Sequence, residues 1–240
     1  MAVKKNQSAE FTIKVLEKIA EHQPVGVTEL SNIMGNTKSS LQRALVTLSE
    51  CKWIRMTHGK SGRWELSERI HTIAYMGRSH SDLRSRARGP LERLRDETGE
   101  TVVLAVPEDG HMVLIESFES RQMVRTSSAV GMTFPVRDSA SGHAVLANLD
   151  PASQEVLLGR PVDIALRKKL DKVRALGYAV NDEALVTGSS NIGAAVFEAG
   201  RPIGAIVVAG PSERLTKKTH SKIGAMVVKT AEMLSHGRMR

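Results

Sequence analysis

Residues 25–66, VGVTELSNIMGNTKSSLQRALVTLSECKWIRMTHGKSGRWEL, decide the fold of the first part of the chain. The spacing of apolar residues predicts a short helix over 28–34, a tight turn, and a second helix over 37–50. Two extended segments, 53–57 and 63–66, flank a turn that contains two glycines. Helix, turn, helix and hairpin in this order are typical of a winged helix-turn-helix, which places its second helix in the major groove of DNA.

A further helix is predicted before this stretch, over residues 8–21, with Ser8 as its N-cap. Its apolar residues recur at helical spacing, as they do in the helix over 37–50. The apolar faces therefore predict three small helices around one shared core. These faces comprise Phe11, Val15, Leu16, Ile19, Ala20, Leu30, Ile33, Leu41, Ala44, Leu45 and Leu48.

The positive charge of the chain is concentrated at its front. The formal net charge is +8, and residues 1–80 hold 12 Lys/Arg against 7 Asp/Glu. Residues 81–95 add 5 arginines and 2 acids, and the rest of the chain is balanced. A basic front and a neutral back suit a nucleic-acid-binding module joined to a domain with another task. A charge excess that only improves solubility is the alternative.

Composition narrows the class of protein. The chain has 240 residues and is 41% hydrophobic, which is enough for a substantial core. No run of about eighteen apolar residues is present, and the N-terminus has no apolar segment of a secretory signal. Cys51 is the single cysteine and is expected in the core beside Trp53, so no internal disulfide or cysteine zinc site is predicted. We expect a cytoplasmic protein without metal, cofactor or membrane partner.

A connector follows the winged helix. Helical spacing over residues 67–80 predicts a linker helix with the apolar residues Ile70, Ile73 and Ala74. The Ser- and Arg-rich stretch 79–89 ends at Gly89-Pro90, where we expect the domain boundary. Pro90 is expected to open a new helix over 90–98, as a residue in the first helical turn.

Beyond residue 99 the apolar period changes from that of helices to that of strands. Strands are predicted at 101–107 and 111–117, joined by a hairpin turn, with extended pieces at 123–127 and 133–136. Further strands are predicted at 178–181, 192–198 and 203–209. Helices are predicted at 139–148, 151–158, 164–176 and 217–234. Strands with helices packed on them predict an α+β sensor-like domain.

Four stretches of the sequence stand out by their order: TELSNIMGNTKSSLQRALVTL at 28–48, RDSASGHAVLA at 137–147, LGYAVNDEALVTGSSNIGAAVF at 176–197 and RPIGAIVVAGPSERLT at 201–216. Together they resemble the IclR-type bacterial transcriptional regulators. Their order and spacing cover nearly the whole chain. One departure is Thr37, where the family commonly has proline; threonine can cap the helix instead.

The resemblance implies an α+β fold in three parts. A winged helix-turn-helix DNA-binding domain would occupy residues 1–67, a linker helix that dimerises 68–89, and a GAF-like α/β effector-binding domain 90–240. Such proteins bind double-stranded operator DNA and a small organic effector, and act as homodimers or tetramers. We expect either a repressor or an activator of genes for the catabolism or efflux of a small organic compound.

The candidate DNA-binding residues lie on the second helix and in the wing. Arg43 and Gln42 have the donors and acceptors that read guanine and adenine. Lys38, Ser39 and Ser40 suit phosphates, and the same role is expected for Lys60 and Arg63 in the wing. A solvated polar helix face is the alternative interpretation.

The resemblance also places an effector pocket in the second domain. The matched residues are Ala140, Ser141, Asn181, Asn191, Val207 and Ala209, with Met132 and Phe134 as apolar wall. Amides at the start of the helix over 139–148 can hold a carboxylate. Val207 and Ala209 stand where some members have serines, which favours an apolar ligand such as an aromatic or longer-chain carboxylic acid. Both residues are equally typical of strand core.

Enzyme motifs are absent from the sequence: there is no G-x-S-x-G, H-E-x-x-H or P-loop pattern, and no catalytic activity is predicted. Two functions remain. The first is a ligand-responsive transcription factor. The second is a ligand-binding sensor whose winged helix makes protein contacts, and salt-dependent DNA binding separates the two.

Overall fold

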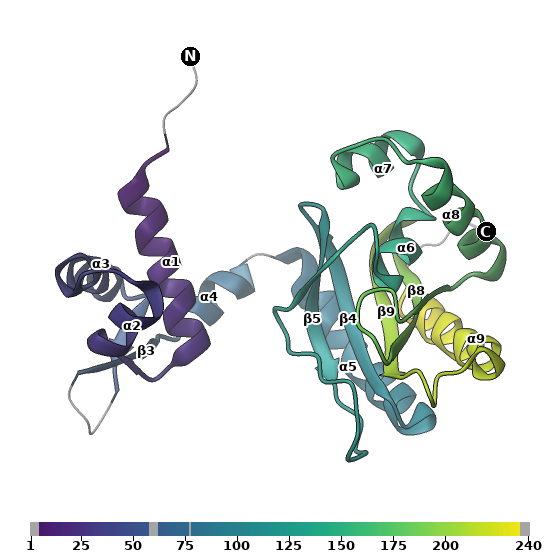
Figure 1. Ribbon diagram of the computed structural model, residues 1–240, viewed down its shortest axis with the longest axis horizontal. Coiled ribbons are helices and arrows are strands. Elements are labelled where there is room, and N and C mark those ends of the chain that lie inside the picture. Colours follow the sequence, from purple (N-terminus) through teal and green to yellow (C-terminus); the bar gives the residue numbers. More distant parts are fainter. Residues whose placement is uncertain (1–4, 58–61, 77, 236–240) are drawn as a thin grey trace. The chain divides into compact units, whose positions relative to one another are not determined.

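The computed structural model describes residues 5–57, 62–76 and 78–235. The chain divides into two compact units, Met1–Ser81 and Asp82–Arg240 (Figure 1). Each unit has a hydrophobic core of its own. The two are therefore described separately.

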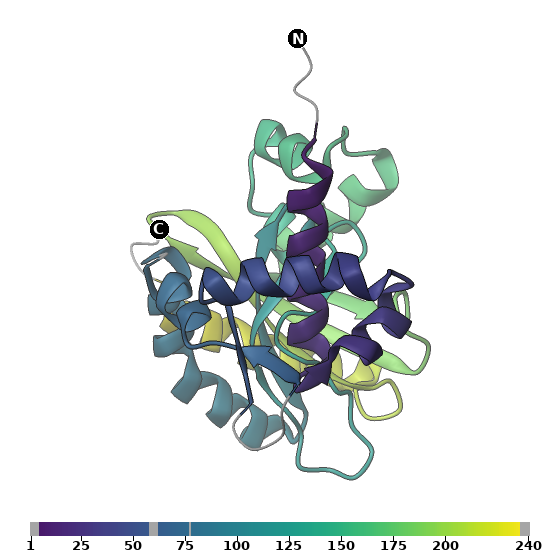
Figure 2. The same cartoon turned by 90° about the vertical axis from the view of Figure 1, so that its left-hand side faces the viewer.

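The first unit is a winged helix. Its elements are α1 (Gln7–His22), β1 (Val25–Gly26), α2 (Val27–Met34), α3 (Lys38–Glu50), β2 (Ile54–Met56), β3 (Arg63–Leu66) and α4 (Arg69–Met76). The three strands form an antiparallel sheet in the order β1-β3-β2. Figure 2 shows α3 lying across α1, and both helices contribute to one core with α2. The expectation of three small helices sharing a core is confirmed, except that Ala20 and Ile33, expected on the buried faces, are exposed.

The ends of these helices follow from local hydrogen bonds. Asn6, and not Ser8 as expected, caps α1: its side-chain oxygen accepts from the amides of Ser8 and Ala9 at 3.1 and 3.2 Å. Asn6 is better placed because α1 already begins at Gln7. Thr37 caps α3 as expected, its hydroxyl accepting from the Ser40 amide at 3.4 Å. Cys51 is exposed at the end of α3, so the expectation that it lies in the core is wrong.

A single helix runs through the point where we expected a break. Helix α5 extends over Arg78–Thr98 with Pro90 inside it, so no helix begins at Pro90. Its buried residues Leu83, Ala87, Leu91 and Leu94 belong to the core of the second unit. Packing against the sheet favours a continuous helix despite the Gly89-Pro90 pair.

The second unit is a six-stranded antiparallel sheet between two helical layers. The strands are β4 (Thr101–Glu108), β5 (His111–Phe118), β6 (Thr133–Pro135), β7 (Ala179–Asp182), β8 (Ser189–Glu198) and β9 (Arg201–Pro211), in the order β6-β5-β4-β9-β8-β7. The remaining helices are α6 (Ala140–Leu146), α7 (Pro151–Leu158), α8 (Ile164–Leu176) and α9 (Lys217–Leu234). Residues 123–127, expected as an extended piece, form no strand.

Alternation along the strands assigns each sheet face to one helical layer. On β4, Val102, Leu104 and Val106 pack in a cluster with α5 and α9. Val103 and Ala105, between them in sequence, pack in a second cluster with α6 and α8. Figure 1 shows α9 and α6 on opposite faces of the sheet. The candidate effector residues Val207 and Ala140 belong to the α6 face.

A close backbone approach fixes the start of α6. A Cβ atom added at Gly142 would lie 2.0 Å from the carbonyl oxygen of Val136. Only glycine lets the helix approach the 133–136 segment this closely. Ser139 caps the helix, accepting from the Gly142 amide at 3.0 Å.

Candidate functional site

The outer face of α3 is polar and exposed. Lys38, Ser39, Gln42 and Arg43 are exposed, while Leu41, Ala44 and Leu45 are buried beneath them. The Ser40 hydroxyl differs because it is half-buried and lies 2.5 Å from the Thr37 hydroxyl. The side chains expected to read bases are therefore on the solvent side of the recognition helix.

Of the two candidate wing residues, Arg63 lies within the described part of the chain and makes contacts inside the protein. Arg63 donates to the Pro24 carbonyl from Nε at 2.9 Å and from Nη2 at 2.7 Å. Its Nη2 also lies 2.9 Å from Glu29 Oε2. Arg63 thus ties β3 to the segment before α2, and a phosphate contact would compete with these bonds. Lys60 lies outside the described residues.

The second unit contains a cavity of about 550 Å³ on the α6 face of its sheet. Every residue expected in the effector site lines this cavity. They are Met132, Phe134, Ala140, Ser141, Asn181, Asn191, Val207 and Ala209. Residues from five separate segments of the chain are thus brought around one space of ligand size.

One side of the cavity is apolar. Val103 on β4 and Leu114 on β5 join Phe134, Val207 and Ala209 there. Val207 and Ala209 are buried, at 5% and 2% exposure, and lie opposite Gly193 and Asn191 in the β8–β9 pairing. Val207 packs in the core and also lines the cavity. The two interpretations of this residue, ligand contact and strand core, are therefore compatible.

The Asn181 side chain links two segments of the chain at the edge of the cavity. Its Nδ2 donates to the Asp138 carbonyl, just before α6, and its Oδ1 accepts from the Ala184 amide at 3.1 Å. Both ends of the side chain are therefore engaged within the protein. The Ser141 hydroxyl donates to the Ser139 hydroxyl at 3.3 Å. Among the three polar candidates, Asn191 has the least engaged side chain, with one long contact of 3.5 Å to Ser189.

Sequence inspection missed the polar side of the cavity, which is built from irregular segments. These residues are Arg125, Thr126, Ser127 and Ser128 in one loop, Thr187 and Gly188 in another, and Ser189 where that second loop enters β8. Loops have no apolar period, so their placement depends on tertiary contacts. The runs of hydroxyl residues were the only available signal.

Arg125 is the cation of this polar side. Its Nε donates to Glu119 Oε2 at 2.9 Å, and the Ser127 hydroxyl donates to Glu119 Oε1 at 2.6 Å. These bonds, that from Ser127 first, hold the pKa of Glu119 below its ordinary value. A guanidinium has five N–H donors, so the bond to Glu119 leaves donors for an anionic ligand.

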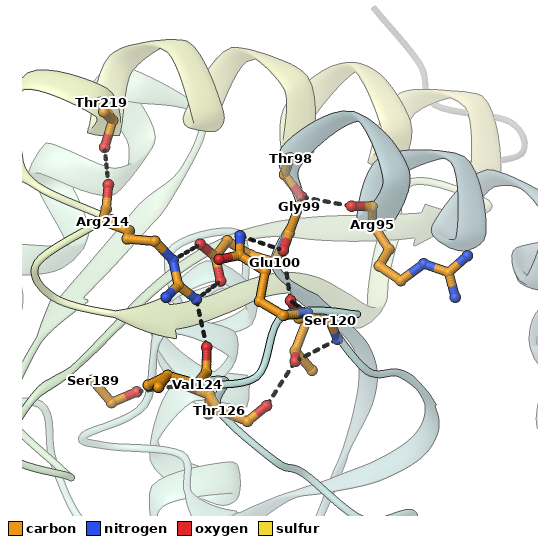
Figure 3. A network of polar contacts seen from close by, with 12 residues as sticks. Arg95, Thr98, Gly99, Glu100, Ser120, Val124, Thr126, Ser189, Arg214 and Thr219 are labelled. Carbon is orange, nitrogen blue, oxygen red and sulfur yellow. Dashed lines mark hydrogen bonds and ion pairs between the residues drawn. The ribbon is translucent and has the colours of Figure 1, made fainter.

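An ion pair between the buried Glu100 and the half-buried Arg214 anchors this loop. Arg214 makes two hydrogen bonds with Glu100, and its Nη2 also donates to the Val124 carbonyl at 3.0 Å (Figure 3). The Thr101 hydroxyl donates to the Thr126 carbonyl at 2.6 Å. The loop that supplies Arg125 is therefore held at Val124 and Thr126, on either side of that residue.

The described residues lack two kinds of feature. Within residues 5–57, 62–76 and 78–235, no helix is long and apolar enough to cross a membrane. In the same part of the chain, no three His, Cys, Asp or Glu side chains gather as metal ligands.

A winged helix with an exposed polar recognition helix, joined to a domain with a ligand-sized cavity, defines a ligand-responsive DNA-binding regulator. Comparison with protein families agrees. Residues 8–57 match the IclR helix-turn-helix domain, and residues 77–236 match the C-terminal domain of bacterial IclR transcriptional regulators. The chain belongs to the IclR family of transcriptional regulators.

Relatives resemble the chain over most of its length. The transcriptional repressor IclR of Escherichia coli is 30% identical, over 98% of this chain and 91% of the relative. The regulator BhcR of Paracoccus denitrificans is 28% identical, over 94% of this chain and 85% of the relative. Both are named as transcriptional regulators, so a winged helix used only for protein contacts is not favoured.

Solved structures share the fold. Thermotoga maritima IclR superposes with a TM-score of 0.77 at 21% identity, covering 96% of this chain and 98% of that one. An IclR homologue from Microbacterium hydrocarbonoxydans, solved with 4-hydroxybenzoate, gives a TM-score of 0.79 at 19% identity, covering 97% and 99%. The expected α+β fold, with a winged helix-turn-helix followed by an α/β domain, is confirmed.

Proposed function

We propose that α3 reads operator DNA and that a small organic acid with an apolar body binds in the α6-side cavity and changes DNA affinity. The genes controlled are those for the catabolism or efflux of that acid. The observation that carries the proposal is the two-sided cavity: Val103, Leu114 and Phe134 on one side, Arg125 on the other. Such a lining matches a ligand with an apolar end and a carboxylate end.

The DNA-binding half of the proposal rests on the exposed face of α3. Gln42 and Arg43 are assigned to base edges, and Lys38 and Ser39 to phosphates. The Ser40 hydroxyl is hydrogen-bonded to the Thr37 hydroxyl. We therefore assign Ser40 to a phosphate contact through its backbone, or through its hydroxyl while that group stays bonded to Thr37. Lys60 and Arg63 remain assigned to the phosphates beside the wing.

An aromatic acid is the effector class that the cavity favours. Phe134 and Met132 offer an aromatic ring and a polarisable thioether to a flat ligand. The homologue solved with 4-hydroxybenzoate supports the same class. Arg125 and the amides at the start of α6 are the groups proposed to hold the carboxylate.

We propose a homodimer or a tetramer in the cytoplasm, where the operator is. The three-part division at residues 1–67, 68–89 and 90–240 is kept as part of this proposal, with the middle part linking two chains. Ile73 on α4 is 40% exposed, and a helix of this length needs packing partners to be stable. Pairing of two chains would present two recognition helices to a palindromic operator.

A panel of carboxylic acids tests the proposal with the full chain. A ligand that binds only the folded protein raises its melting temperature, so benzoate and its hydroxylated forms should do so. Methyl benzoate, which lacks the charge, should act weakly. The acid that binds should also change the affinity of the protein for the DNA next to its own gene, measured by gel-shift titration. If no acid in the panel raises the melting temperature or changes DNA binding, the proposed effector class is wrong.

A matched pair of variants locates the carboxylate. Arg125→Gln should remove the preference for benzoate over its methyl ester. Arg121→Gln is the control, because Arg121 is an arginine earlier in the same loop whose side chain is outside the cavity wall. Equal behaviour of the two variants would exclude Arg125 as the anchor.

A further inference from the structure

A second cavity in the same unit is lined by basic side chains. Its volume is about 650 Å³, and its wall is built from α6, β7, α8 and the start of α9. It shares only Asn181 with the wall of the first cavity. The two are therefore separate spaces with different linings.

Three lysines from two helices meet at this second cavity. Lys169 and Lys172 come from α8, and Lys217 is the first residue of α9. Among the described residues of the wall, Asp182 is the single carboxylate. Two positive charges are thus left without a counter-charge in the lining.

The acids nearest to these lysines in sequence are already paired with arginines. Asp163, at the start of α8, pairs with Arg137. Asp171, in the middle of α8, pairs with Arg174 at 2.6 Å. Among the described residues, no carboxylate lies within ion-pair distance of Lys169, Lys172 or Lys217. The charge of the cavity is therefore available to a ligand.

The two histidines of the wall are fixed by backbone carbonyls. His143 donates from Nε2 to the Arg137 carbonyl at 2.5 Å, and His220 donates from Nε2 to the Leu215 carbonyl at 3.0 Å. Burial first, with a contribution from Lys169, holds the pKa of His143 below its ordinary value. Burial therefore disfavours a positive charge on His143, and Lys169, Lys172 and Lys217 are cations of this wall.

Most of the rest of the wall is apolar. Val173, Leu176, Tyr178 and Val180 contribute to it. The Tyr178 ring packs directly on α9, because a Cβ atom at Gly224 would lie 2.6 Å from the ring. An organic body carrying several negative charges would find both an apolar surface and cations here.

We propose that this cavity binds a small multivalent anion, such as a phosphorylated metabolite or a tricarboxylate. At least two negative charges are required, because three lysines and one carboxylate line the cavity. A monovalent aromatic acid would leave lysine charge unbalanced, so the two cavities select different ligands. The inference rests on the lysine wall and is independent of the effector assigned to the first cavity.

Calorimetric titration of the full chain with inorganic pyrophosphate, at constant ionic strength, tests the site. Lys169→Gln/Lys217→Gln removes two cavity charges. Lys168→Gln/Lys218→Gln removes two from adjacent positions of the same helices that do not line the cavity. We expect the first pair to weaken pyrophosphate binding about tenfold or more, since charge-assisted hydrogen bonds are lost, and the second pair to change it little.

A third variant keeps every lysine in place. Ala184→Glu adds a negative charge to the wall at an exposed position and should also weaken pyrophosphate binding. Unfolding curves of all variants verify that each is folded. Equal losses in the two lysine pairs would show general surface attraction and overturn the site. Absence of saturable binding by the unmodified chain at millimolar pyrophosphate would overturn it as well.

Discussion

Arg214 and Glu100 form a two-pronged ion pair at the end of the sheet. Nε lies 2.6 Å from Glu100 Oε1, and Nη2 lies 2.8 Å from Oε2 (Figure 3). Glu100 is 3% exposed, and a Cβ atom at Gly210 would lie 2.6 Å from its Oε2. Because Arg214 also donates to the Val124 carbonyl, the pair fixes a loop that lines the first cavity.

Arg214→Met should weaken both stability and ligand binding. It leaves the buried Glu100 carboxylate without its cation, which costs roughly 1–3 kcal/mol of unfolding free energy once the partial exposure of Arg214 is considered. Ligand affinity should fall because Val124 loses its anchor. Urea unfolding and ligand titration measure the two effects. Arg201→Met, at the exposed start of β9, is the control; equal unfolding midpoints for the two variants would contradict the role of the pair.

Gly142→Ala should destabilise the second unit despite the higher helix propensity of alanine. The added Cβ would meet the Val136 backbone, which cannot move aside as a side-chain end would. Helix α6 would have to shift away from the sheet, and overpacking of this kind costs about 1–3 kcal/mol. Thermal unfolding measures the loss. An unchanged or raised melting temperature would mean that α6 is not held against the 133–136 segment.

The helical and strand periods of the apolar residues predict most elements of the fold. A clear exception is the helix that contains Gly89 and Pro90. Helices α7, α8 and α9 begin and end at the residues predicted from the sequence. In the sequence, Gly89 and Pro90 indicate a helix break, whereas the apolar stripe on either side of them indicates a continuous helix. Leu83, Ala87, Leu91 and Leu94 keep helical spacing across Pro90, so the continuous helix was present in the pattern. Burial of that stripe outweighs the hydrogen bond that proline removes.

The candidate effector site was predictable only in part. Strand and helix residues such as Asn191 and Ala140 could be matched by their place in regular elements. Arg125 could not, because its position depends on the Arg214–Val124 and Thr101–Thr126 hydrogen bonds between segments distant in sequence. The same dependence explains why the engaged state of Asn181 was not foreseen.

Arg43→Ala should weaken specific operator binding by about 1–3 kcal/mol if Arg43 contacts a base edge. The side chain is exposed on α3, so the fold should be unaffected. Gel-shift titrations against operator and random DNA separate base reading from charge. Arg167→Ala, which removes an exposed arginine from α8, is the control. Unchanged operator affinity would remove Arg43 from base recognition.

His143 should make the second unit less stable as pH falls below about 6.5, its ordinary pKa. Burial holds its folded pKa below that value, so the unfolded chain binds the proton first and stability decreases with falling pH. Carboxylates with lowered pKa, such as Glu119 and Asp163, act at lower pH than this.

Unfolding free energies at about pH 7.5 and about pH 5.5 measure the His143 effect. His143→Asn should reduce the difference between the two values, whatever its effect on absolute stability. The same pH dependence in the variant would assign the proton uptake to another group.

Ala209→Ser should change the ligand preference of the first cavity. Ala209 is buried opposite Asn191, so an added hydroxyl would enter the wall between an apolar side and a partly engaged amide. When an apolar ligand body binds, that hydroxyl would lose its contact with water. This loss costs about 1 kcal/mol of binding free energy, which lowers the affinity roughly fivefold. A short polar acid can hydrogen-bond to it and should bind equally well or better. Calorimetry with benzoate and a short hydroxy acid compares the two. If neither affinity changes and the protein stays folded, Ala209 serves only the strand core, and the assigned polarity of the cavity is wrong.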